Sequence, residues 1–99
     1  MIDAGELTRE FFEGRIGDVF TLVTQPVVEL KLAEVVAWGP QLGDGGRDPF
    51  RLDFTGPAGL RMPQRIYRMS LASGEVMELF LVQNADGPDG TSRAEAIFS

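Results

Sequence analysis

Phe50-Arg51-Leu52-Asp53-Phe54 and Tyr67-Arg68-Met69-Ser70-Leu71 carry the strongest structural pattern in this chain of 99 residues. In both stretches apolar and polar side chains alternate, so every second residue can face a core while its neighbours face water. A period of two is typical of antiparallel strands with one buried face. No equally clear signature of chemistry accompanies this pattern.

The same pattern, interrupted by glycine- and proline-containing turns, predicts six strands. Their ranges are residues 18–24, 27–37, 49–55, 64–72, 76–83 and 92–98. The connections are too short for crossover helices, which argues against a parallel sheet. Before the first strand, residues 8–13 are typical of one short helix, with Thr8 as N-cap and Gly14 as a left-handed stop. We therefore predict an all-β fold, a small six-stranded antiparallel barrel or rolled sheet with one short N-terminal helix, in which residues 1–99 form a single β-barrel-like domain.

Two interruptions of the alternation lead to further predictions. A bulge at Ala33-Glu34 would turn Glu34 outward and bring Val35 and Ala37 inward. In Val76–Val82, Phe80 and Val82 share a face with a glutamate, so this strand is apolar on both sides. Either the N-terminal helix or another subunit must cover that outer face, and we favour the helix.

The alternation also predicts the core. Its expected members are Phe20, Leu22, Leu30, Leu32, Phe50, Leu52, Phe54, Tyr67, Met69, Leu79 and Leu81. The acidic side chains of the strands (Glu29, Glu34, Asp53 and Glu78) are expected outside, with Lys31, Arg51 and Arg68 as cross-strand partners. Exposed pairs of this kind contribute at most about 1 kcal/mol and imply no activity.

Composition excludes several classes of site. The chain contains no cysteine and no histidine, which rules out disulfides, thiolate nucleophiles, Cys/His zinc sites and histidine-based triads within it. General acid–base chemistry would then need a strongly shifted carboxylate or a comparable group. We accordingly expect no catalytic residues, no cofactor and no metal site.

Charge and segment composition bear on partners and location. The net charge of −6 argues against nucleic acid and anionic membranes as partners. The start, Met1–Glu6, has neither a basic nor an apolar region of a signal peptide, and no apolar run approaches the roughly 20 residues of a membrane helix. The expected location is cytoplasmic, or within an exported assembly.

The charge is unevenly distributed. Residues 47–68 hold five arginines against two aspartates, a net +3, whereas the remainder holds four basic and thirteen acidic residues, a net −9. Such polarity either steers a protein partner or a second copy of the chain, or reflects no more than a solvated face.

Two loops and one tryptophan are candidate sites. Asn84–Gly90 is rich in oxygen ligands but lacks calcium-loop spacing, so a plain turn is expected. Gly39–Arg47 is glycine-rich but lacks the Lys-Ser/Thr of a phosphate loop. Trp38, before this loop, either closes the rim of the core or anchors an interface.

Longer stretches resemble a family. They are Leu7-Thr8 with the Phe11 helix, Gly17–Phe20, Val28–Val35, Arg47–Phe50 with Leu52–Phe54 and Gly56-Pro57, Pro63–Tyr67, Glu78–Val82 and Glu95–Phe98. Together they resemble an uncharacterised bacterial domain-of-unknown-function family (number 6916) over nearly the whole chain. Arg93-Ala94 departs from it, because the family tends to have an aromatic residue before Glu-Ala. The resemblance transfers no functional residues, and it implies an accessory or structural role in a fibre or phage-tail-like assembly.

Three function classes follow from these observations. The leading hypothesis is a non-catalytic structural or protein-interaction module, with contacts from Trp38, Arg47, Phe80 and Val82. An open edge, strand 18–24 or strand 92–98, would accept a partner strand unless the barrel closes. The alternative is a small-ligand-binding barrel, which dense aromatic packing of the interior would disfavour. An enzyme is the third class and would need two carboxylates of separated pKa in a cleft.

Overall fold

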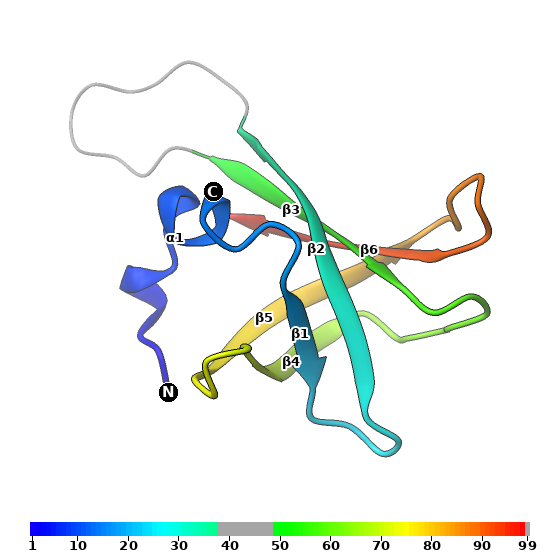
Figure 1. Ribbon diagram of the computed structural model, residues 1–99, viewed down its shortest axis with the longest axis horizontal. Helices are drawn as coiled ribbons and strands as arrows, with labels where there is room; N and C mark the ends of the chain where they lie inside the picture. The colour runs from blue at the N-terminus through cyan, green and yellow to red at the C-terminus, as the bar shows by residue number, and fades with distance from the viewer. Residues whose placement is uncertain (38–48, 99) are drawn as a thin grey trace.

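The computed structural model describes residues 1–37 and 49–98 and shows a closed antiparallel barrel with a short helix at one end (Figure 1). Its elements are η1 (Ala4–Glu6), α1 (Arg9–Glu13), β1 (Val19–Leu22), β2 (Val28–Ala37), β3 (Phe50–Gly56), β4 (Arg65–Ser70), β5 (Val76–Asn84) and β6 (Ser92–Phe98). Around the barrel the order is β1-β2-β3-β6-β5-β4. The predicted all-β class, the strands and the N-terminal helix are confirmed, and the sheet closes as a barrel.

The long strand β2 bends at the predicted bulge. Its register against β3 shifts between Leu32 and Glu34, which turns Glu34 to solvent and half-buries Val35. The inward placement of Ala37 is wrong, because this residue is exposed. Ala37 forms the last pair of the β2–β3 ladder, opposite Phe50.

All eleven residues predicted for the core are buried. The structure adds Leu7, Phe12, Leu71, Met77, Ala94 and Ala96. Both alanines lie on the inner face of β6, Ala94 opposite Phe54 and Ala96 opposite Leu52 of β3, where their small side chains leave room for these larger ones. Phe20 and Phe54 meet edge to face across the interior, with ring centroids 5.5 Å apart.

The helix α1 closes one end of the barrel. Thr8 caps it, its Oγ1 accepting a hydrogen bond from the Phe11 amide at 3.2 Å. Phe12 is fully buried, and its ring centroid lies 6.1 Å from that of Phe50 and 5.6 Å from that of Phe98. The helix therefore inserts an aromatic plug between strand ends.

Two expectations about this helix are wrong. It does not cover the outer face of β5, where Phe80 remains half exposed, because its apolar side chains pack against aromatic residues at the strand ends instead. Gly14 is not left-handed: its φ is −75°, and the chain continues in right-handed turns until Gly17, whose φ is 95°.

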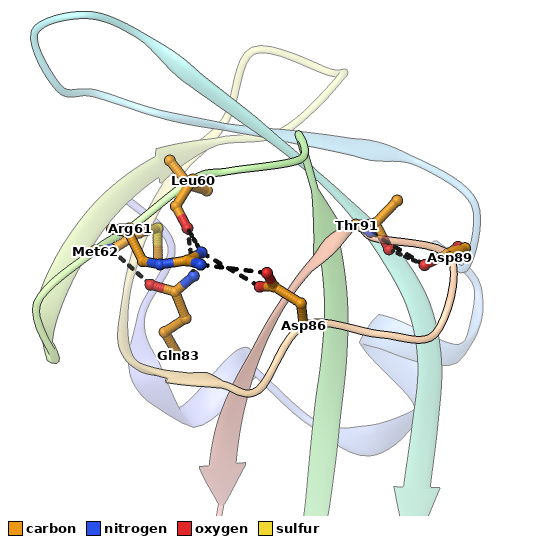
Figure 2. A network of polar contacts seen from close by, with 7 residues as sticks. All are labelled: Leu60, Arg61, Met62, Gln83, Asp86, Asp89 and Thr91. Carbon is orange, nitrogen blue, oxygen red and sulfur yellow. Dashed lines mark hydrogen bonds and ion pairs between the residues drawn. The ribbon is translucent and has the colours of Figure 1, made fainter.

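The connection from β3 to β4, residues 57–64, crosses the opposite end of the barrel. The side-chain amide of Gln83 in β5 holds this connection through two hydrogen bonds. Its Oε1 accepts from the Met62 amide at 2.6 Å, and its Nε2 donates to the Leu60 carbonyl at 2.6 Å (Figure 2). The Tyr67 hydroxyl donates to the Pro63 carbonyl at 2.6 Å. Side chains of the sheet thus hold this crossing strap in place.

The β4–β5 hairpin joins the rest of the barrel through short backbone seams. Six residue pairs link β4 to β5, whereas two link β1 to β4 and three link β5 to β6. Two further backbone bonds join the hairpin to neighbouring segments: the Val23 amide donates to the Arg68 carbonyl at 2.9 Å, and the Ile2 amide donates to the Val76 carbonyl at 2.8 Å. Both candidate edge strands, β1 and β6, are paired on two sides, so the condition under which a partner strand would add to them is not met.

The first stability prediction concerns Phe54. Replacing this buried ring by alanine should cost about 3 kcal/mol or more, because the cavity lies against Phe20 in a packed interior. Chemical denaturation measures the loss. Thr55→Ala, on the outward side of the same strand, is the matched control. A loss below about 1 kcal/mol for Phe54→Ala would show that the assigned face of β3 is wrong.

The second stability prediction concerns Gly56, at the end of β3. A Cβ there would lie 2.7 Å from both Leu30 Cδ2 and Ser92 Oγ, so Gly56→Ala should destabilise the protein by about 1–3 kcal/mol. Gly5→Ala is the control, because no heavy atom lies within 4 Å of its added Cβ. Equal unfolding midpoints for the two variants would contradict this close packing.

Candidate functional site

Two of the four predicted contact residues, Trp38 and Arg47, lie outside the residues that the structure describes. The other two, Phe80 and Val82, lie on the outer face of β5. Phe80 is 50% exposed, while Val82 is half-buried where β5 pairs with Glu95 of β6. Of the predicted contact residues, the structure therefore describes those on the outer face of β4 and β5.

Phe80 has an apolar neighbour that the sequence analysis missed. Ile66 of β4 stands directly opposite it in the ladder and is 65% exposed. The alternation of residues 65–70 contained the signal, because Tyr67 and Met69 point inward and Ile66 therefore shares the outward face with Arg68. Opposed side chains of an antiparallel pair lie within contact range, so Ile66 and Phe80 form a joint apolar patch.

A charged row borders this patch. Arg68 of β4 stands opposite Glu78 of β5, and Arg68 Nη2 lies 3.4 Å from Glu78 Oε2. The predicted cross-strand pairing of these two residues is confirmed. Both side chains remain about half exposed, at 55% and 44%, so their charges are available to a partner.

Arg51 and Asp53 instead pair along one strand. Arg51 Nε donates to Asp53 Oδ1 at 2.8 Å and Nη2 to Oδ2 at 3.1 Å, on the outward side of β3. The hydrogen bond to Asp53 is the main reason that the pKa of Arg51 lies above its usual range. With Arg93 and Glu95 of β6, this pair lines a shallow polar hollow of about 340 Å³.

The second candidate surface is the barrel mouth under the strap 57–64. An opening of about 230 Å³ lies there. Its lining is Leu22, Thr24, Gln25, Pro26, Val28, Leu60, Arg61, Met62, Pro63, Arg65 and Tyr67. Most of these groups are apolar, and two arginines stand at the rim. Arg65 lies over the Tyr67 ring, 5.1 Å from its centroid.

The loop that resembled a calcium site is built as a turn. Asp86 pairs with Arg61 of the strap, with both oxygens 3.3 Å from guanidinium nitrogens. Asp89 accepts from the Thr91 amide at 3.1 Å and from its hydroxyl at 2.7 Å. Figure 2 shows the two carboxylates directed to different partners. The hydrogen bonds from Thr91 are the main cause that lowers the pKa of Asp89 below its usual value.

Within residues 1–37 and 49–98, acidic side chains do not gather in threes around a point where a metal ion would sit. The helices of that part of the chain are also too short and too polar to cross a membrane.

Comparison with known proteins gives one match. No curated protein and no solved structure matches the chain. A family model described as a domain of unknown function, DUF6916, matches residues 7–98. The match begins just before the capped helix and ends with β6, so it takes in the plug as well as all six strands. The chain therefore belongs to the DUF6916 family.

Proposed function

We propose that this protein is a non-catalytic protein-interaction module and that it binds its partner through the outer face of the β4–β5 hairpin. The observation that carries the proposal is the exposed cross-strand pair of Ile66 and Phe80. Single exposed apolar residues are ordinary, whereas adjacent large ones rimmed by charge are typical of contact surfaces. Burial of such a side chain contributes about 1.5–3 kcal/mol.

The chemistry of the chain supports the non-catalytic part. Without histidine or cysteine, a general base would have to be a strongly shifted group such as a carboxylate with a raised pKa. The strand carboxylates Asp53 and Glu78 instead lie outside the barrel, beside arginines. The shifted carboxyl in the described loops, Asp89, has its pKa lowered, which is the wrong direction for a base near neutrality.

The finer role within this proposal is that of an accessory subunit or chaperone of a fibre or phage-tail-like assembly. Its support is the family resemblance set out above, and the interaction surface is consistent with it. A subunit of such an assembly needs a stable scaffold and an adhesive face, and it needs no catalytic group.

The test is a quantitative pull-down from the native host. Tagged wild-type protein should retain a protein at near-stoichiometric yield, either a fibre- or tail-like protein or an untagged copy of the same chain. Phe80→Ser should lose at least about tenfold of that yield, because it removes the central apolar contact. Val27→Ser, an exposed valine on the β1–β2 connection, is the matched control and should retain it. A clean wild-type bait, or equal yields from all three proteins, would overturn the proposal.

The barrel mouth favours a second candidate function, the binding of a small ligand. The interior itself is occupied by the contacting rings of Phe12, Phe20 and Phe54, so a ligand would have to sit in the opening beneath the strap. Its apolar lining and the rim arginines suit a compound with an apolar body and an anionic group.

The probe for this candidate is 8-anilinonaphthalene-1-sulfonate, which has that chemistry. If the mouth is a binding site, titration should shift amide resonances of Leu22, Val28 and Leu60 with saturable one-to-one behaviour. Shifts confined to Glu78 and Phe80 would show adsorption to the hairpin face and would remove the ligand-binding candidate.

A further inference from the structure

We propose that the partner on the β4–β5 face is a second copy of this chain, stacked face to face about a two-fold axis parallel to the strands. The inference rests on the proposed function and identifies its partner. A two-fold contact uses the same patch on both copies, so the patch must be complementary to itself. The order of residues on the hairpin meets that condition.

Three outward-facing rows of the hairpin combine unlike side chains. Arg68 on β4 stands opposite Glu78 on β5, and Ile66 on β4 stands opposite Phe80 on β5. The next row pairs Ser70 with Val76. In each of these three rows, therefore, the residue on β4 differs from the residue on β5 and is compatible with it.

A two-fold axis that runs along the strands, midway between β4 and β5, uses these rows directly. Rotation about it lays β4 of one copy over β5 of the other and keeps each row at the same height. Arg68 then faces Glu78 of the second copy, and Ile66 faces Phe80 of the second copy. No row brings like charges together, because the two members of each row exchange strands. Aligned sheets pack about 10 Å apart, a separation that these side chains can span.

The charge of the hairpin face favours self-association, whereas the net charge of the whole chain opposes it. The net charge is −6, so two copies repel over most of their surfaces. The charged row of the hairpin face carries one arginine against one glutamate, so this row is neutral. Stacking removes water from both the charges and the apolar pair, and lower local dielectric strengthens the attraction between opposite charges.

The experiment uses two single charge reversals, Arg68→Glu and Glu78→Arg. Each variant alone carries two like charges in the row, so each homodimer is repelled, and its dissociation constant should rise at least about tenfold. An equimolar mixture should restore a heterodimer, because two glutamates then face two arginines. Mixing cannot rebuild the pair within either chain, so recovery reports contact between copies.

Native mass spectrometry distinguishes the two masses, and sedimentation velocity gives the dissociation constants. Circular dichroism melting of each variant checks that both remain folded. Phe80→Ser should yield monomer, while Val27→Ser should dimerise as the wild type does. A wild-type dimer unaffected by either charge reversal, or a mixture with no heterodimer, would overturn the stacked arrangement.

The outcomes also separate this inference from the proposed function. A monomeric wild type overturns the second copy as partner. If that monomer still captures a host protein in a manner that depends on Phe80, the interaction module stands with a different partner. If it captures nothing, both proposals fail.

Discussion

The barrel depends on side-chain packing to hold the β4–β5 hairpin, because its backbone seams are short. The hairpin is well paired within itself but shares two residue pairs with β1 and three with β6. What completes the closure is its inner row of Tyr67, Met69, Met77, Leu79 and Leu81, all buried against the other strands. A small six-stranded barrel has an interior just large enough for side chains to fill, so its closure depends on how those side chains pack.

The two ends of the barrel follow from the same constraint. A closed sheet has no free edges, but its ends stay open until some other part of the chain covers them. Phe12 fills one end through ring contacts with Phe20, Phe50 and Phe98. At the other end, the 57–64 strap is bonded to Gln83 at both Leu60 and Met62. Each cover is thus fixed to the sheet by side chains, the helix by aromatic packing and the strap by hydrogen bonds.

Alternation made the strands, the core and the bulge in β2 predictable, because these depend on which side of one strand a residue faces. It gives no information on which surface a separate element will cover. Phe11 and Phe12 showed that the helix must dock, yet its position depends on rings brought together from β1, β3 and β6. In the sequence Gln83 is an ordinary polar residue of a strand. Its role in holding the strap can be recognised only once the position of the strap in the fold is known. Ile66 could have been found, since the phase of Tyr67 already placed it outside.

The self-complementarity of the hairpin face has a general origin in antiparallel pairing. Such a ladder sets one residue of each strand opposite one residue of the other in every row, and a two-fold axis along the strands exchanges the two between copies. Rows of unlike residues therefore become favourable contacts, whereas rows of like charges would repel both within and between copies. The Arg68–Glu78 pair stabilises the isolated hairpin only weakly, since it is half exposed. Between two stacked faces the same two residues would also set the register, because a slip by one row along the strands would separate each charge from its opposite charge and bring the charges of one copy onto Ile66 and Phe80 of the other.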